Sequence, residues 1–258
     1  MLPRTITADL SGACILVTGA SSGLGEHFSR MLAAKGARII CAARRRDRLD
    51  GLVADIRAAG GQADAVTMDV ADAASIRSGV AQASALTGQI DGLINNSGIA
   101  PARALVEQTA DEWNSVIATN LSGARHVAVE VAKTMIAERT GGSIVNIASI
   151  LALRQGSNLS AYATSKAALA QLTKQMALEW ARHDIRVNAL APGYIETPMT
   201  AAFFQTEAGR AQLQRVPQRR LGKPDDLDGI VLLLLSQASS FMTGSIIAVD
   251  GGHLVSSL

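Results

Sequence analysis

Short apolar runs alternate with helix-like segments along nearly the whole chain, and this alternation limits the fold more than any other feature. The runs lie at residues 13–18, 38–43, 63–68, 90–95, 143–148, 185–190 and 245–249. Unbroken apolar runs of this length are typical of parallel strands that helices cover on both faces. The segments between them carry apolar residues at helical spacing. The pattern predicts an α/β fold, a doubly wound parallel sheet of seven strands flanked by helices.

Helices are expected between these runs, at residues 23–35, 49–59, 73–86, 109–119, 121–139, 160–182 and 224–235. One domain of this type commonly reaches 258 residues, so residues 1–258 are expected to form a single domain. Residues 194–220 show the least regular pattern. Because long segments after a strand often cover a binding site, a substrate lid is expected there.

Composition excludes several classes of protein. Apolar residues make up 48% of the chain and charged residues 18%, which is typical of a globular protein. The net charge of +2 argues against nucleic acid or a membrane surface as a partner, and the longest aliphatic run, 230–235, is too short to span a bilayer. Both cysteines lie in apolar runs, the histidines lack metal-ligand spacing, and the first dozen residues lack a signal-peptide core. A reduced, cytoplasmic protein without a metal is expected.

A glycine-rich loop joins the first strand to the first helix. It reads Thr18-Gly-Ala-Ser-Ser-Gly-Leu-Gly25. Glycines permit a tight turn and let backbone N–H groups approach a pyrophosphate, whose charge the helix N-terminus stabilises. The loop therefore predicts a dinucleotide site formed by Gly19, Ser21, Ser22, Gly23, Leu24 and Gly25.

The residues after the second strand indicate which dinucleotide binds. A site for NAD uses a carboxylate there to hold the ribose 2′-hydroxyl, but Ala43 occupies this place and Arg44 begins a run of arginines. Guanidinium groups suit the 2′-phosphate of NADP. Cations beside a helix N-terminus are unfavourable unless an anion binds. NADP(H) is therefore favoured over the alternative, NAD(H), although a solvated charge run is the plainer interpretation of the arginines.

Polar residues also follow the third and fourth strands. Asp69 is placed to accept a hydrogen bond from an adenine amine, but a helix N-cap role for Asp69 or Asp72 explains it equally well. Asn96 and Gly98 belong to a sharp turn whose backbone would pass close to the cofactor ribose. In doubly wound sheets ligands bind beyond the carboxyl ends of the strands, so these residues are expected at one site.

A hydroxyl, a phenol and an ammonium group occur in the stretch from Ser149 to Lys166. Ser149 ends the fifth strand, and Tyr162 and Lys166 are four residues apart on the next helix, so their side chains share one face. Alone, a tyrosine with a lysine one turn later is a weak signal. Beside a dinucleotide site, the three groups predict proton transfer at one oxygen atom.

These motifs together resemble those of the short-chain dehydrogenase/reductase family. The matching segments cover nearly the whole chain and are Thr18–Gly25, Asp69–Val70, Asn95–Gly98, Asn120, Ser149, Tyr162–Lys166, Pro192–Gly193 and Thr197. Ser97 departs from the alanine that is usual in the family. The resemblance implies a Rossmann-like sheet and an oxidoreductase that interconverts a ketone and a secondary alcohol by hydride transfer.

The resemblance also implies the roles of individual residues. Tyr162 would be the general acid or base, and the Lys166 ammonium would lower its pKa and hold the nicotinamide ribose. Ser149 would bind the substrate oxygen, and Asn120 a water that links Lys166 to solvent. Considered without the family, Asn120 is a helix N-cap. Cofactor contacts are further expected from Val70, Tyr162, Lys166, Pro192, Gly193, Ile195 and Thr197.

A largely apolar substrate pocket is expected under the lid. Its walls would be Leu151, Leu153, Gln155, Met199, Phe203 and Phe204. The alternative is that the phenylalanines pack on the body of the protein or on a neighbouring subunit. The general look-alikes are ketoacyl reductases that act on carrier-bound substrates, but Arg139, Arg182 and His183 match their carrier-binding residues only approximately.

Apolar residues occupy much of the circumference of the helices at 121–139 and 160–182, which predicts a second buried face and a homotetramer. Two other classes of function stay open. A dinucleotide-binding sensor or scaffold without turnover would have no need of Tyr162. A nucleic-acid-binding protein would need a basic face larger than Arg44–Arg48. The expected partner is therefore a small carbonyl or alcohol compound.

Overall fold

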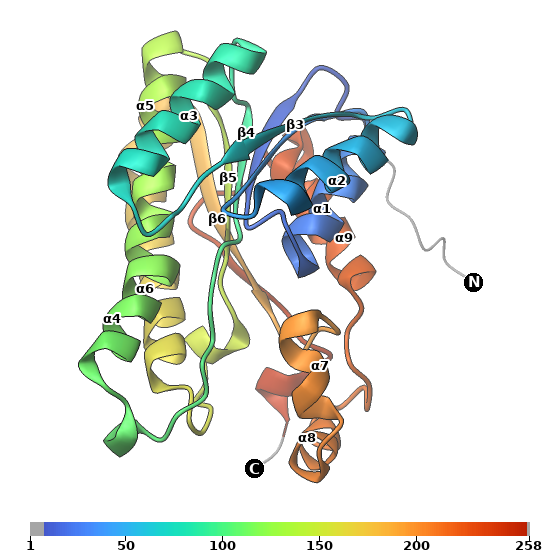
Figure 1. Ribbon diagram of the computed structural model, residues 1–258, viewed down its shortest axis with the longest axis vertical. Coiled ribbons are helices and arrows are strands. Elements are labelled where there is room, and N and C mark those ends of the chain that lie inside the picture. Colours follow the sequence, from blue (N-terminus) through green and yellow to red (C-terminus); the bar gives the residue numbers. More distant parts are fainter. Residues whose placement is uncertain (1–7, 257–258) are drawn as a thin grey trace.

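The computed structural model describes residues 8–256 as a seven-stranded parallel sheet between two layers of helices (Figure 1). The strands are β1 (Cys14–Thr18), β2 (Arg38–Ala43), β3 (Gln62–Thr67), β4 (Gly92–Asn95), β5 (Gly142–Ile147), β6 (Ile185–Pro192) and β7 (Ile246–Val249). The α-helices are α1 (Gly23–Ala33), α2 (Arg46–Ala58), α3 (Ala73–Thr87), α4 (Ala110–Ile117), α5 (Ala124–Glu138), α6 (Ser160–Trp180), α7 (Pro198–Phe204), α8 (Glu207–Leu213) and α9 (Asp228–Leu235). The described residues include neither end of the expected domain 1–258. They also leave out most of the first dozen residues, where a signal peptide would lie.

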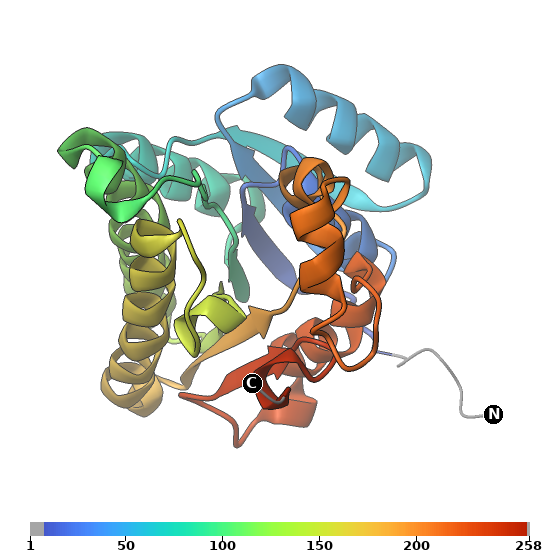
Figure 2. The ribbon, with the colours of Figure 1, turned by 90° about the horizontal axis from the view of Figure 1, so that it is seen from below.

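The order of the strands is β3-β2-β1-β4-β5-β6-β7, and every pair of neighbours is parallel. The chain begins in the middle at β1, builds outward to β3, and returns to β4 on the other side of β1. The direction of winding therefore reverses between β1 and β4, which opens a crevice at the carboxyl ends of the strands. Figure 2 views the molecule from this end, with α7 near the viewer. The predicted doubly wound sheet is confirmed.

Two hydrophobic clusters fill the space between the sheet and its helices. One lies under α1, α2 and α9 and includes Phe28, and the other lies under α3, α5 and α6 and includes Met176. Successive residues of β1 face opposite clusters: Ile15 packs in the first and Leu16 in the second. This arrangement explains why most residues of the central strands are apolar. Within residues 8–256, no helix combines the length and apolar character needed to cross a membrane.

The fourth and fifth helices are not separate, as the sequence suggested. A π-helical segment, Ala118–Gly123, joins α4 directly to α5. Asn120 lies inside this segment and is fully buried, so its proposed N-cap role is wrong. A Cβ atom at Gly123 would collide with the carbonyl oxygen of Val70. The wide turn is therefore pressed against the loop that follows β3, and only glycine fits at the contact.

The expected lid is more regular than its sequence pattern indicated. Residues 194–220 contain both α7 and α8. Thr197 is the N-cap of α7 and is followed by Pro198 at the first helical position, a common way to begin a helix. At the base of the lid, Ile195 pairs with Gly222 in an isolated parallel bridge. The segment expected to be a lid thus contains two short helices, with the bridge between Ile195 and Gly222 at its base.

Candidate active site

The glycine loop has the shape that its sequence predicts. Gly19 and Gly23 have φ angles of +68° and +57°, a left-handed conformation that favours glycine. A Cβ atom at Gly25 would lie 2.6 Å from Nδ2 of Asn96 and would also collide with the carbonyl oxygen of Gly19. Ser22, the N-cap of α1, makes no side-chain capping hydrogen bond. The loop is therefore tightly packed, and the N-terminus of α1 is open toward the crevice.

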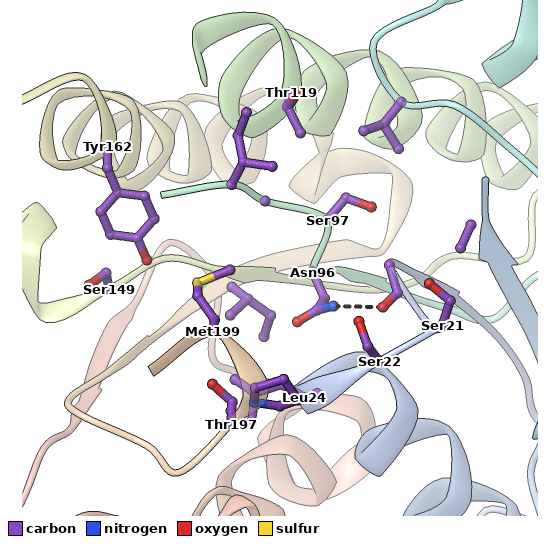
Figure 3. A pocket seen from close by; sticks show the side chains of 18 of the residues that line it. Ser21, Ser22, Leu24, Asn96, Ser97, Thr119, Ser149, Tyr162, Thr197 and Met199 are labelled. Atoms are coloured by element: carbon purple, nitrogen blue, oxygen red, sulfur yellow. Dashed lines mark hydrogen bonds between the residues drawn. The ribbon is translucent and has the colours of Figure 1, made fainter. Parts of the chain in front are cut away.

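Thr18 and Asn96 join the loop to the turn after β4. The Thr18 hydroxyl oxygen accepts hydrogen bonds from the N–H groups of Asn96 (3.0 Å) and Ser97 (3.2 Å). Nδ2 of Asn96 donates to the carbonyl oxygens of Thr18 (3.1 Å) and Gly19 (3.4 Å; Figure 3). Asn96 therefore holds the loop in place with its side chain. The supporting role of Thr18 was not foreseen from the sequence.

The loops that follow β1 to β6 surround one cavity of about 540 Å³. Nearly all the predicted cofactor residues line it: Gly19, Ser21, Ser22, Gly23, Leu24, Arg44, Asp69, Val70, Asn96, Gly98, Tyr162, Lys166, Pro192, Gly193, Ile195 and Thr197. Gly25 lies behind the loop instead of on the wall. Asp72, not Asp69, caps α3, because its carboxylate accepts a hydrogen bond from Ala74 N–H at 2.8 Å. Asp69 faces the cavity.

Arg45 is the arginine that the structure fixes beside the glycine loop. Its Nη2 donates to the hydroxyls of Ser21 (2.9 Å) and Ser22 (3.0 Å). Arg44 is exposed on the wall of the same cavity, and Arg46 points elsewhere and pairs with Asp50 at 2.8 Å. Two guanidinium groups thus stand where β2 ends. The sequence singled out Arg44 alone, because nothing in a run of arginines tells which side chains turn inward.

Ser149, Tyr162 and Lys166 meet at the other end of the cavity. The phenol oxygen of Tyr162 points toward the Ser149 side chain (Figure 3). The Ser149 hydroxyl oxygen also accepts a hydrogen bond from Leu151 N–H at 3.1 Å, which fixes its direction. Nζ of Lys166 donates to the carbonyl oxygen of Ile147 at 2.7 Å and lies 5.7 Å from the centre of the Tyr162 ring. The predicted hydroxyl, phenol and ammonium are therefore neighbours.

Burial shifts the pKa values of both Tyr162 and Lys166. It raises the pKa of Tyr162, an effect that the Ser149 hydroxyl opposes, and it lowers the pKa of Lys166 to about 8. The sequence predicted a lowered phenol pKa, and this prediction is wrong for the structure. Burial disfavours the phenolate more than the hydrogen bond of the Ser149 hydroxyl favours it.

Asn120 lies behind the cavity wall. Its Oδ1 accepts a hydrogen bond from Ile99 N–H (2.9 Å), and its Nδ2 donates to the Ile99 carbonyl (2.9 Å) and to the Ser165 hydroxyl (3.1 Å). An amide oxygen has two acceptor positions, so one stays free. Because the side chain is fully buried, any water bound to it would be internal.

Only one of the six residues expected to form the substrate pocket reaches the cavity wall. Met199 lines it, whereas Leu151 is buried beneath the loop and Gln155 is exposed outside it. Phe204 packs against the ring of Tyr194, with centroids 5.1 Å apart. For Phe204 the alternative interpretation, packing on the body, is the one that the structure supports. The apolar spacing of α7 did not reveal which of its residues turn inward.

Several wall residues had no signal in the sequence. Ser115 on α4 and Thr119 in the π-helical segment face the cavity, as does Ile99 after β4. The first two come from the middle of a helical stretch, where no motif marks them.

Outside the cavity, His27 of α1 contacts Asp228 of α9 at 2.7 Å and Asp225 at 3.8 Å. The contact between His27 and Asp228 joins two helices of one layer, so we assign it to the fold.

Comparison with known proteins places this geometry in a family. The profile of a family described as enoyl-(acyl carrier protein) reductase matches residues 19–253. The 3-oxoacyl-(acyl-carrier-protein) reductase of Thermotoga maritima is 38% identical over 95% of this chain and 99% of its own length. The gluconate 5-dehydrogenase of Gluconobacter oxydans is 38% identical over 96% of each chain.

Solved structures agree with these relatives. The gluconate 5-dehydrogenase of Burkholderia cenocepacia, crystallised with NADP and tartrate, superposes with a TM-score of 0.93 at 36% identity and covers 96% of this chain and 98% of its own. A short-chain type dehydrogenase/reductase from Mycobacterium marinum superposes with a TM-score of 0.91 at 37% identity, over 95% and 96% of the two chains. On the combined evidence of sheet topology, glycine loop, profile and relatives, the chain belongs to the short-chain dehydrogenase/reductase family.

Proposed function

We propose that the protein is an NADP(H)-dependent oxidoreductase that interconverts a ketone and a secondary alcohol, with Tyr162 as the general acid and base. The observation that carries the proposal is the position of Tyr162, Ser149 and Lys166 in the same cavity as the glycine loop. A dinucleotide laid along this cavity would reach the phenol with its far end. A sensor or scaffold without turnover has no use for such a group.

The residues present fit the cofactor. The open N-terminus of α1 and the glycines packed behind it suit a pyrophosphate. Arg44 and Arg45, with the hydroxyls of Ser21 and Ser22, suit a 2′-phosphate, and β2 ends at Ala43 without a carboxylate for a 2′-hydroxyl. Three related proteins of known structure were crystallised with NADP. Asp69 would serve the adenine, and Gly193 and Thr197 the nicotinamide end.

The chain's own residues would supply the proton, and also a hydrogen bond and a positive charge beside the reacting oxygen. When bound, the nicotinamide supplies or accepts the hydride. In reduction, Tyr162 would give its proton to the carbonyl oxygen, and in oxidation it would take the hydroxyl proton. Ser149 would donate a hydrogen bond to the same oxygen as negative charge develops. The Lys166 ammonium would stabilise the phenolate that remains and would hold the ribose hydroxyls.

Asn120 would act mainly by holding the wall. Its amide is hydrogen-bonded to both polar backbone groups of Ile99, which lines the cavity. A proton path from Lys166 through a water on Asn120 remains part of the proposal, with the water enclosed behind the wall.

We propose a small, free carbonyl or alcohol compound as the substrate. Met199 borders the cavity and is 59% exposed, so it is placed to contact such a compound. The basic residues considered for carrier binding lie elsewhere in the subunit. Arg182 and His183 follow the C-terminal end of α6, whose 21 residues span about 30 Å from the end that carries Tyr162. A carrier protein docked over this cavity would not meet them on the same subunit.

We further propose a homotetramer in the cytoplasm. Of the apolar residues on α5 and α6 that suggested a second buried face, Val127, Val131, Met135, Leu169 and Met176 are buried within the subunit. An outward apolar surface still exists, because Leu178 of α6 is 76% exposed and Trp180 is only partly buried. Both cysteines are free and buried, as expected in a reducing compartment.

The test is a panel of small ketones and secondary alcohols assayed with NADPH, NADP, NADH and NAD. We expect turnover of at least one pair, with kcat/KM higher for NADPH than for NADH. Tight binding of the dinucleotide without turnover of any member would favour the sensor. Turnover with a clear preference for NADH would refute the cofactor assignment.

A further inference from the structure

Ser165 is a polar residue in the core of the site that the proposed chemistry does not use. It lies on α6 between Tyr162 and Lys166 and is fully buried. Its hydroxyl donates a hydrogen bond to the carbonyl oxygen of Tyr162 at 2.7 Å. The Ser165 hydroxyl oxygen in turn accepts a hydrogen bond from Nδ2 of Asn120 at 3.1 Å. Ser165 therefore joins the first turn of α6 to the π-helical segment.

The connection continues to the cavity wall. Asn120 makes two hydrogen bonds of 2.9 Å with the backbone of Ile99. Its Oδ1 accepts from the Ile99 N–H group, and its Nδ2 donates to the Ile99 carbonyl oxygen. Ile99 and the preceding Gly98 line the cavity, and a Cβ atom at Gly98 would lie 3.4 Å from Oδ1 of Asn120 and 3.6 Å from Nζ of Lys166. Four hydrogen bonds thus run from the backbone of Tyr162 to the wall formed by the loop after β4.

Water cannot replace a hydrogen bond that is lost between these side chains. Asn120 and Ser165 are both fully buried. The two protons on Nδ2 of Asn120 have exactly two partners, Ile99 and Ser165, so loss of the Ser165 oxygen leaves one buried donor without an acceptor. The unpaired donor favours rotation of the Asn120 amide toward another acceptor, and this rotation would break both hydrogen bonds to Ile99.

We propose that Ser165 is a positioning residue that sets the distance between the Tyr162 phenol and the wall formed by the loop after β4, acting through Asn120 and Ile99. The inference rests on the proposed function. Proton and hydride must reach the two ends of one carbonyl bond together, so small displacements of either group cost rate. The glycine loop and Arg45, which would hold the phosphates of the dinucleotide, lie outside this set of hydrogen bonds. Loss of Ser165 is therefore expected to lower kcat and to leave NADPH affinity unchanged.

The test compares Ser165→Ala with Thr164→Ala, which removes a hydroxyl from the adjacent, exposed position of the same helix. We expect Ser165→Ala to lower kcat roughly tenfold to a hundredfold while the Kd for NADPH stays within about twofold. Thr164→Ala should leave both unchanged. Ser165→Thr, which keeps the hydroxyl, should recover most of the rate. If Ser165→Ala fails to fold, Ser165→Cys, of nearly equal size and weak in hydrogen bonding, replaces it with the same expectation.

Hydrogen exchange separates positioning from general destabilisation. The Ile99 amide is protected by Asn120, so Ser165→Ala should accelerate exchange in the peptide that contains residues 97–101 and leave the β1 peptide as in the wild type. In a double-mutant cycle, adding Ser165→Ala to Asn120→Ala should cost no further rate. Unchanged exchange at 97–101, or additive losses in the cycle, would overturn the proposal. If the wild type shows no turnover, the proposed function fails, and the exchange result still decides the inference.

Discussion

Burial acts on Tyr162 and Lys166 in opposite directions. It raises the pKa of the phenol, which therefore stays protonated at neutral pH, and it lowers the pKa of the Lys166 ammonium to about 8. A protonated phenol is the form that can give a proton to a carbonyl. The charge on Lys166, by contrast, is lost within the range of an ordinary assay. In the proposed mechanism, Lys166 would therefore set the upper pH limit of carbonyl reduction.

The first prediction concerns this limit. Because the ammonium is present below its pKa and absent above it, kcat/KM for NADPH should fall as the pH rises through about 8. This parameter reports groups of the free enzyme, the state that the structure describes. In Lys166→Arg the guanidinium stays charged, so the residual activity should be level to about pH 10. A level profile in the wild type over the same range would show that another group carries the charge.

Arg45 decides the preference for NADP(H) in our account. Its guanidinium is held by two serine hydroxyls at the mouth of the glycine loop. Hydrogen bonds to charged groups contribute about 1.5–3 kcal/mol, so Arg45→Ala should raise KM for NADPH roughly 10- to 150-fold and change KM for NADH little. Arg46→Ala is the matched control, because Arg46 pairs with Asp50 away from the cavity. Equal effects of Arg45→Ala on both cofactors would refute the assignment.

At the scale of the elements, β1 and α1 work as one unit with the loop between them. Gly25, in the first turn of α1, packs so closely on Gly19 that no side chain fits. The close contact places the helix N-terminus directly behind the loop. We therefore expect that the affinity for the dinucleotide depends on a residue that does not touch it.

Gly25→Ala tests this dependence. The added methyl group must displace the Gly19 carbonyl or the Asn96 amide, so the Kd for NADPH should rise at least about tenfold and the melting temperature should fall. Gly51→Ala in α2 is the control, since nothing lies within 4 Å of its Cβ position. It should stabilise the protein by about 0.5–1 kcal/mol, because alanine is the better helix former. Unchanged NADPH affinity in Gly25→Ala would contradict the account.

The elements that the sequence predicted well are those whose pattern is local. β2 begins and ends at the predicted residues, because both faces of a parallel strand are buried and its run of Arg38–Ala43 is sharply bounded. The glycine loop and the Tyr162–Lys166 pair were also recognised, because the spacing of each coincides with a predicted strand end and helix start. The π-helical segment was missed, since its position depends on Asn120 bonding to Ile99, 21 residues earlier. Arg45 and Thr119 were missed because tertiary packing decides where they point.

At the scale of the whole molecule, several large apolar side chains stay outside the two core clusters. The clusters lie between the sheet and the two layers of helices that Figure 1 shows. On the outer side of α6, Leu178 is 76% exposed, and Phe241 in the segment before β7 is fully exposed. Exposed apolar groups of this size are typical of contact surfaces. In the proposed tetramer, a second copy of the chain covers Leu178.

Light scattering at micromolar concentration tests this assembly. The expected mass is four times the chain mass of 26.8 kDa. Leu178→Lys should lower the mass, because it places a charge in the proposed interface. Leu86→Lys, at a 39% exposed position on α3, should leave the mass as in the wild type. A monomeric mass for the wild type would contradict the homotetramer.

The most direct test of the account is the rate of Tyr162→Phe with NADPH and the best ketone of the panel. Phenylalanine keeps the ring and removes the phenolic proton donor. The account predicts that NADPH binds as tightly as in the wild type, while kcat falls roughly 10²- to 10⁴-fold. A Tyr162→Phe enzyme that binds NADPH and reduces the ketone at the wild-type rate would contradict it.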